Sequence, residues 1–414
     1  MPKISLITGL DIGSTAIRIA VGQKSKENDK IKIVGAIEIP AQGISKGVVV
    51  SVEDAVSSIS SSLERIERMV GQPVEHAWVG ISGSHIIAQE SKGVVAVSKT
   101  DGEIRPEDVE RVIEAARAVA TPPNYEILHV IPRSFTVDSQ TGIKDPIGMT
   151  GIRLEVDAQI IQGLSAQIKN LTKCIYRTGL DIDDLVLAVL ANSESVLTNR
   201  QKELGVAVVN IGGATTSLAV FEEGDVLHTV ILPVGSEYIT SDIAIERRIS
   251  IDTAERIKVR EGSCLPENFR KQDETRYSDV GGVEEGAFSK KHVAEVIEAR
   301  VEEIMEKVDK ELKKIGKSGM LPAGVVLTGG GAKLDGLVEL AKKALRLPAS
   351  LGYPQGIISN LDKVGDLSFT TAVGLVIWGS QLQKSGKFSL PHFPFKSVDK
   401  ASSHLREWFK SLLP

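Results

Sequence analysis

The stretch at residues 209–221 reads VNIGGATTSLAVF, and the rest of the chain is interpreted outward from it. Two runs of strand-forming residues flank a glycine turn, which predicts a β-hairpin. Backbone N–H groups in such a turn can hold a phosphate. Asn210 stands where a metal-binding loop would carry a carboxylate. The stretch therefore raises two questions: whether a nucleotide binds here, and whether it can be hydrolysed.

The same pattern occurs once before in the chain. Residues 11–21 read DIGSTAIRIAV and residues 210–220 read NIGGATTSLAV, so that Asp11 corresponds to Asn210 and Gly13 to Gly212. One such loop is weak support for a ligand site, because most glycine-centred hairpins are simply turns. Two of them predict a duplicated α/β domain, in which each half supplies one phosphate loop to a shared cleft.

A third glycine element follows the two hairpins. Residues 327–337 read LTGGGAKLDGL, which places three glycines between a buried strand and a helix. Glycine lets a ligand approach the backbone closely, and a helix N-terminus favours negative charge. Alone this motif is weak, but the order loop, loop, strand–GGG–helix is a specific combination.

Composition narrows the class of protein. The 414 residues are 42% hydrophobic and 25% charged, which is ordinary for a globular chain of several subdomains. The net charge of −5 argues against nucleic-acid binding. Two cysteines fit a reducing cytoplasm. The N-terminus lacks the features of a signal peptide, and no apolar run is long enough to cross a bilayer.

Hydrophobic periodicity predicts the secondary structure. Hairpins are expected at 5–21 and 206–221, and strands at 31–40, 74–82, 93–98, 127–138, 152–161 and 323–328. Helices are expected at 52–70, 106–120, 165–179, 185–198, 239–261, 289–315, 334–345 and 371–382.

Longer motifs point to a known family. They are AWVGISGSHI (77–86), EDVERVIEAARAVATPP (107–123), EILHVIPRSF (126–135), KDPIGMTGIRLEV (144–156), ITSDIAIERR (239–248) and VIEARVEEI (296–304). With the three glycine elements, they make the chain resemble the FtsA family of bacterial cell-division proteins, within the actin, Hsp70 and sugar-kinase superfamily. The resemblance covers about Gly9 to Leu382, with a matching tail.

The resemblance implies an actin-like α/β fold of duplicated domains around a nucleotide cleft, with an inserted α+β subdomain. It divides the chain as follows: 1–83 with 164–203 and 365–384, the first actin-like subdomain; 84–163, the insert; 204–234 with 318–364, the second; 235–317, a small subdomain that closes the cleft; 385–403, a linker; and 404–414, an amphipathic helix.

The resemblance also assigns the residues of an ATP and Mg²⁺ site. The first phosphate loop is Asp11, Gly13, Ser14 and Thr15, and the second is Asn210, Gly212, Gly213, Ala214, Thr215 and Thr216, with Gly235 beyond it. Gly329, Gly330 and Gly331 are expected against the adenosine, and Glu255 and Lys258 at the ribose. Without the family, that last pair would be read as a solvated helix salt bridge.

Two departures from the family bear on hydrolysis. Relatives carry an Asp at the position of Asn210, so Mg²⁺ is expected to depend on Asp11 through water and on the phosphates. Ala188 replaces the Glu of the family's Glu-Pro-Leu-Ala-Ser run, the usual candidate for positioning the attacking water. Glu194 lies too far around the helix to substitute. We expect ATP binding with very slow or absent hydrolysis, although the changes can also be neutral drift.

The chain ends in SSHLREWFKSLLP, residues 402–414. One apolar stripe at helical spacing contains Leu405, Trp408, Phe409, Leu412 and Leu413. It can pack on the protein's own core, or lie in a membrane surface with its basic neighbours at anionic headgroups. Residues 384–414 carry a net charge of +4 against −9 for the remainder. Position, charge and the family resemblance favour the membrane.

The resemblance implies partners as well. In the family the small subdomain holds the C-terminal peptide of the tubulin-like protein FtsZ, and Arg300 matches a position that is usually basic there. The alternative is a solvated surface arginine. The expected function is an ATP-binding protein that self-assembles, tethers FtsZ filaments to the cytoplasmic face of the membrane at the division site, and recruits other division proteins. Two alternatives stay open: a PilM-like pilus adaptor, which needs no membrane helix, and a kinase of the same superfamily.

Overall fold

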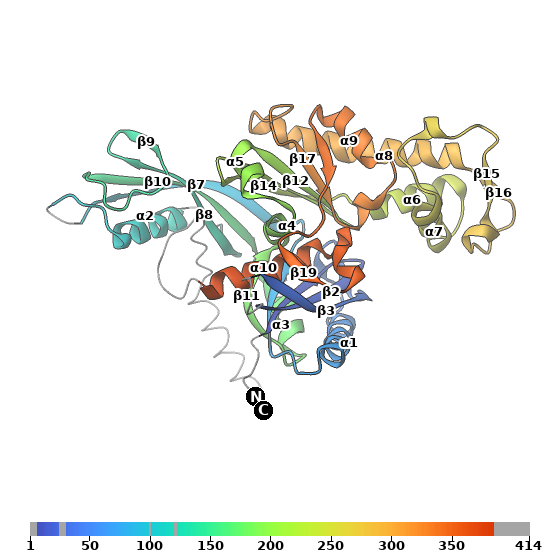
Figure 1. Cartoon of the computed structure of the whole chain (residues 1–414), viewed down its shortest axis with the longest axis horizontal. Coiled ribbons are helices and arrows are strands. Elements are labelled where there is room, and N and C mark those ends of the chain that lie inside the picture. Colours follow the sequence, from blue (N-terminus) through green and yellow to red (C-terminus); the bar gives the residue numbers. More distant parts are fainter. Residues whose placement is uncertain (1–5, 25–29, 99–100, 120–121, 385–414) are drawn as a thin grey trace.

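The computed structural model describes residues 6–24, 30–98, 101–119 and 122–384. Two lobes, each built on one sheet, form the body of the molecule. A teal subdomain and a yellow subdomain extend from this body at opposite ends (Figure 1).

The first lobe holds a six-stranded sheet. Its order is β11 (Asp181–Leu187), β6 (His76–Ile81), β1 (Leu6–Ile12), β2 (Ala16–Lys24), β3 (Ile31–Pro40) and β19 (Ile357–Ser359). The strands β1, β2 and β3 form an antiparallel meander, and β6 and β11 continue from β1 in parallel. Helices α1 (Val52–Val70) and α3 (Ser165–Tyr176) pack together in the same lobe.

The second sheet repeats the first. Its order is β14 (Asp225–Leu232), β13 (Thr216–Glu222), β12 (Val206–Ile211), β17 (Val325–Thr328) and β18 (Ala349–Leu351). Again an antiparallel meander is followed by two parallel strands. The duplication predicted from the two hairpins is confirmed. One detail of the expected division is wrong: β19 pairs with β3, so 357–359 belongs to the first sheet.

Two central helices join the lobes. Gly374 of α10 (Thr370–Lys384) lies so close to α4 (Ala188–Val196) that a Cβ there would overlap the Ala191 carbonyl oxygen. Thr370 is the buried polar link: its Oγ1 accepts from Asn192 Nδ2 at 2.7 Å and lies 2.9 Å from Thr328 Oγ1 at the end of β17. This buried, hydrogen-bonded contact ties both central helices to the end of β17 in the second sheet.

The insert is a separate α+β unit. Its sheet has the order β7 (Ile86–Ala96), β10 (Arg153–Leu164), β8 (Tyr125–Val137) and β9 (Gln140–Ile143), with α2 (Pro106–Val119) packed on it. Ile104, Val112, Phe135 and Val156 are among the residues of its own hydrophobic core. The insert therefore buries enough apolar surface to form a body of its own beside the two lobes.

The small subdomain corrects one prediction. It contains α6 (Ser236–Arg247), α7 (Ile251–Glu261), the short pair β15 (Glu274–Arg276) and β16 (Ala287–Ser289), and the long helix α8 (Lys290–Lys314). The single helix expected at 239–261 is wrong. Arg248 adopts a left-handed conformation with φ of 54°, and the Ser250 hydroxyl caps the second helix by accepting the Thr253 N–H.

The predicted elements omit several strands, among them β9, β11, β14, β18 and β19. Residues 185–187, expected to be helical, end the strand β11, and α5 (Asn199–Leu204) follows α4 separately. A buried parallel strand that runs into a buried helix has one continuous apolar pattern, so periodicity alone does not separate them. The strand β14 follows a charged turn, and its apolar and polar residues do not alternate strictly, so the pattern typical of a strand is absent. The last predicted helix and linker, 385–414, lie outside the described residues.

Candidate functional site

A cavity of about 430 Å³ is lined by residues of both lobes and of α7. That volume is in the usual range for a site that binds a small molecule. Of the predicted binding residues, all but Thr216 and Gly235 line it. Those brought together are Asp11, Gly13, Ser14, Thr15, Asn210, Gly212, Gly213, Ala214, Thr215, Glu255, Lys258, Gly329, Gly330 and Gly331.

The two hairpin loops have the same backbone geometry. Gly13 N–H donates to the Ala16 carbonyl oxygen at 3.1 Å, and Gly212 N–H donates to the Thr215 carbonyl oxygen at 2.9 Å. The strand registers also correspond, since Asp11 lies opposite Arg18 as Asn210 lies opposite Ser217. Each loop thus makes the same turn at the end of the same strand of its sheet.

The two loops meet across the cleft. A Cβ added to Gly213 of the second loop would overlap Thr15 Oγ1 of the first. The same Thr15 hydroxyl donates to Glu237 Oε1, on α6, at 3.2 Å. The hairpins are therefore neighbours, and backbone N–H groups from both can serve one ligand.

The third glycine loop closes the cavity, and its three glycines differ. Gly329 has φ of 88° and faces Asn210 Oδ1, and Gly331 packs against Ile211, so a side chain at either position would collide with protein atoms. Gly330 has open space where its Cβ would be. The fold itself therefore does not require glycine at 330, whereas a ligand that approaches the backbone would.

Asp11 is the carboxylate of the first loop. Burial raises its pKa to about 6, while the Arg18 guanidinium lowers it. Arg18 lies opposite Asp11 on β2 and forms an ion pair with Glu38 at 2.8 Å. Both Arg18 and Glu38 line the cavity, and the sequence interpretation missed them. The cross-strand register of the hairpin was the available signal, because it places Arg18 beside Asp11.

Glu255 and Lys258 face the cavity from α7, one helical turn apart. Their side chains form an ion pair at 2.6 Å. The Lys258 ammonium is buried and also donates to Thr240 Oγ1 at 2.8 Å and to the Ser236 carbonyl oxygen at 3.3 Å. The pair is thus part of the cavity wall, and not a solvated surface bridge. Glu255 is the more exposed partner of the pair, at 45% against 9% for Lys258.

Thr216 and Gly235 support the second loop from outside the cavity. Thr216 is buried, and its hydroxyl donates to the Val234 carbonyl oxygen at 2.8 Å. Gly235 packs against the carbonyl groups of Gly212 and Gly213, where a Cβ would not fit. We correct their expected placement: they hold the loop in place without reaching the space between the lobes.

Neither candidate for a water-activating base is in position. Ala188 lines the cavity with a methyl group at the start of α4. The Glu194 carboxylate pairs with the buried Lys202 ammonium at 2.6 Å and does not line the cavity. Within the described ranges, no group of three or more His, Cys, Asp or Glu side chains could hold a metal ion.

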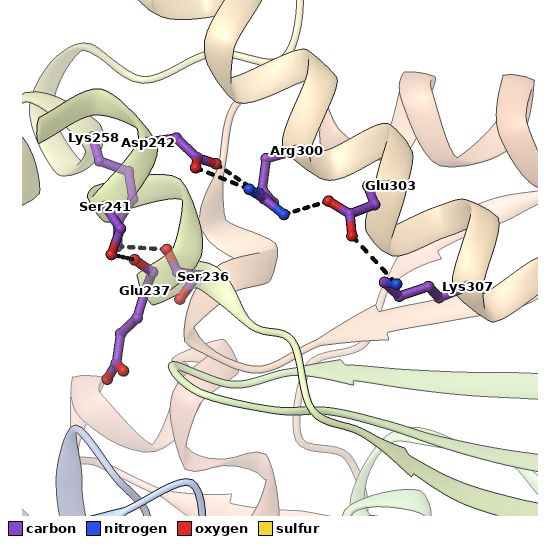
Figure 2. A network of polar contacts seen from close by, with 8 residues as sticks. All are labelled: Ser236, Glu237, Ser241, Asp242, Lys258, Arg300, Glu303 and Lys307. Atoms are coloured by element: carbon purple, nitrogen blue, oxygen red, sulfur yellow. Dashed lines mark hydrogen bonds and ion pairs between the residues drawn. The ribbon is translucent and has the colours of Figure 1, made fainter. Parts of the chain in front are cut away.

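Arg300 is already occupied by intramolecular contacts. Its guanidinium binds both carboxylate oxygens of Asp242, at 2.6 and 2.9 Å, and pairs with Glu303 (Figure 2). It also lies over the Tyr238 ring. Neither expectation, an exposed anchor or a solvated arginine, describes this geometry. An acidic peptide would have to compete with Asp242 and Glu303 for the same donors.

The predicted membrane stripe, Leu405 to Leu413, lies outside the described residues. Among the helices that the structure does describe, none combines the length and apolar character needed to cross a bilayer.

Comparison with known proteins identifies the family of the chain. A family model described as the SHS2 domain inserted in FTSA matches residues 83–162, and one described as cell division protein FtsA matches residues 207–374. Cell division protein FtsA of Pseudomonas aeruginosa is 38% identical over 381 residues, which are 92% of this chain and 91% of that protein. The chain belongs to the FtsA family. Its insert is the SHS2 domain of that family of cell-division proteins.

Solved structures place this FtsA-family chain in the actin-like fold. A PilM–PilN type IV pilus biogenesis complex has a TM-score of 0.66 at 15% identity, covering 90% of this chain and 98% of that one. MreB5 of Spiroplasma citri bound to ADP has a TM-score of 0.54 at 14% identity, covering 92% and 98%. At such identities the likeness is one of fold alone. The pilus-adaptor alternative therefore gives way to the FtsA family.

Proposed function

We propose that the cavity binds ATP together with Mg²⁺. The observation that carries this is the pair of hairpin loops, closed by the same hydrogen bond and in the same register, that meet across one cavity. Gly330 adds to it, because it lines the cavity and leaves open space in which a ligand can approach the backbone. The fold neighbour MreB5 was solved with ADP bound. Asp11 would hold Mg²⁺ through water, with Asn210 offering an uncharged oxygen, and the ion would offset phosphate charge.

Hydrolysis in this site is proposed to be very slow. Asn210 removes one of the charges that would retain the metal ion, and Ala188 has no group that accepts a proton from water. Loss of general-base assistance typically reduces a rate by roughly 10² to 10⁴. Nucleotide occupancy, more than turnover, would then control how subunits assemble.

The proposed cellular role is a self-assembling tether between FtsZ filaments and the cytoplasmic face of the membrane at the division site. The stripe Leu405, Trp408, Phe409, Leu412 and Leu413 would lie in the membrane surface. The small subdomain around Arg300 would hold the FtsZ C-terminal peptide. A single short helix binds weakly, so assembly would strengthen attachment by presenting many tails together.

Co-sedimentation with anionic vesicles tests this role. The intact chain should sediment with the vesicles, more so with MgATP, and should bring a labelled FtsZ tail peptide with it. The variant Trp408→Glu/Phe409→Glu should stay in the supernatant, because two charges replace the aromatic side chains that enter the lipid. Ser411→Glu, off the stripe, adds a charge without removing an aromatic side chain; it is the control and should lose much less binding. Full retention of the double variant would refute the membrane role of the tail.

A further inference from the structure

The first turn of α6 crosses the cleft. The exposed Glu237 accepts the Thr15 hydroxyl hydrogen through Oε1 at 3.2 Å, although Thr15 belongs to the first lobe and Glu237 to the small subdomain. A Cβ on Gly213 would collide with both the Glu237 carboxylate and Thr15 Oγ1. The carboxylate therefore covers the point where the two phosphate loops meet. Figure 2 shows the Glu237 side chain extending away from the Arg300–Asp242 pair.

This position conflicts with a bound phosphate. A carboxylate and a phosphate repel each other, and both require the Thr15 hydroxyl and the space beside Gly213. The backbone of the helix cannot easily retreat, because Ser236 N–H donates to the Gly212 carbonyl oxygen at 2.9 Å and Glu237 N–H to that of Gly213 at 2.8 Å. A phosphate in these loops would therefore turn the Glu237 side chain out of its contact with Thr15.

The next residue, Tyr238, links the first turn of α6 to Arg300, which is paired with Asp242 and Glu303. The Tyr238 ring has Lys46 Nζ 5.9 Å from its centroid and Arg300 Cζ 5.6 Å from it. Lys46 lies in the turn between β4 (Ile44–Ser45) and β5 (Val48–Val49), on the first lobe. The neighbouring Gly47 N–H donates to Ser14 Oγ of the first phosphate loop at 3.1 Å. Glu237 and Tyr238 thus each contact the first lobe, and Tyr238 also contacts Arg300.

We propose that Glu237 is a latch that phosphate releases. In the latched state its carboxylate ties α6 to Thr15 and holds Tyr238 between Lys46 and Arg300. A nucleotide displaces the carboxylate, changes the packing around Tyr238, and so alters the Arg300–Asp242 site. The latch rests on the proposed nucleotide site, and its effect on an acidic peptide also rests on the proposed peptide site.

The first experiment measures the MgATP affinity of the full chain by calorimetry. Glu237→Gln keeps the size of the side chain and removes its charge, so the affinity should rise about fivefold, the factor expected for relieving one like-charge contact near water. Glu246→Gln makes the same change at the other end of α6, where the carboxylate pairs with His292, and should leave affinity unchanged. Glu237→Ala, in a helical position that tolerates alanine, should reproduce the increase.

Unchanged affinity in both Glu237 variants would overturn the latch. Reduced affinity would also overturn it, because Glu237 would then assist phosphate or metal binding. A second measurement compares the affinity of a synthetic FtsZ tail peptide with and without MgATP. Lys46 lies outside the cavity lining and the Arg300 ion pairs. Lys46→Met should therefore leave the affinity for MgATP alone and for the peptide alone unchanged, but reduce the effect of MgATP on peptide affinity. If no peptide binds, the proposed partner fails, while the Glu237 result still decides the latch.

Discussion

At the scale of single residues, Gly330 is the glycine of the third loop that contacts within the protein do not require. Its neighbours Gly329 and Gly331 are required by contacts within the protein, whereas a methyl group at 330 would enter empty space. We expect Gly330→Ala to lower MgATP affinity by about tenfold or more, since the backbone could no longer approach the ligand closely. The thermal midpoint of the ligand-free protein should hardly change.

The matched control for this prediction is Gly365→Ala. Gly365 also has open space around its Cβ position and an ordinary φ, but it does not line the cavity. Its nucleotide affinity should equal that of the parent chain. Equal affinities for the Gly330 and Gly365 variants would show that the ligand does not contact the third glycine loop.

A second residue-scale prediction concerns hydrolysis. Ala188→Glu combined with Asn210→Asp restores both family carboxylates at positions that line the cavity. The phosphate-release rate should rise by roughly 10² if the general base is what this chain lacks. Asn210→Asp alone should mainly strengthen the dependence of nucleotide binding on Mg²⁺. A double variant as slow as the parent would place the cause elsewhere in the site.

At the scale of elements, a buried histidine joins the insert to the first lobe. His129, on β8, accepts the Leu187 N–H through Nε2 at 2.9 Å, and burial lowers its pKa to about 4. Below about pH 6.5 the unfolded chain takes up a proton that the folded chain does not, so this residue lowers folding stability as pH falls from about 6.5 to 4, by up to about 3 kcal/mol.

The corresponding test is urea unfolding at several pH values. His129→Gln keeps an acceptor without a titrating ring, so its free energy of unfolding should fall less steeply than that of the parent between pH 6.5 and 4. Parallel slopes for the parent and His129→Gln would mean that this histidine does not titrate as described.

Elements with a strong local signal were predicted well. The helix at 52–70 has a Ser51 cap and ends at Gly71 with φ of 75°, as its sequence indicates. The predicted elements are wrong where the local sequence signal is ambiguous or where tertiary packing outweighs it. The left-handed Arg248 interrupts a helical pattern that otherwise continues. The strand β14 has no strict alternation of apolar and polar residues, and its Asp225 pairs with Lys144 of the insert.

At the scale of the whole molecule, the cavity is lined by loops from both lobes and by α7 of the small subdomain. A ligand held by loops from both lobes would stabilise them together. We expect MgATP at 100 times its dissociation constant to raise the free energy of unfolding by about 2.7 kcal/mol. Thermal melts at increasing MgATP should show this shift, and Gly330→Ala should need more nucleotide for it. A midpoint independent of MgATP would contradict the proposed site.

The sequence alone determined the duplication, the two hairpin turns, the third glycine loop and the family resemblance, because each depends on residues that are neighbours in the chain. The tertiary structure decided the features that depend on residues far apart in the chain. These are the hydrogen bond of Thr15 with Glu237, the ion pairs of Arg300, the position of Thr216 and Gly235 behind the second loop, and the open space at Gly330. Contacts between residues far apart in sequence depend on how the sheets and helices pack, and no local pattern encodes that packing.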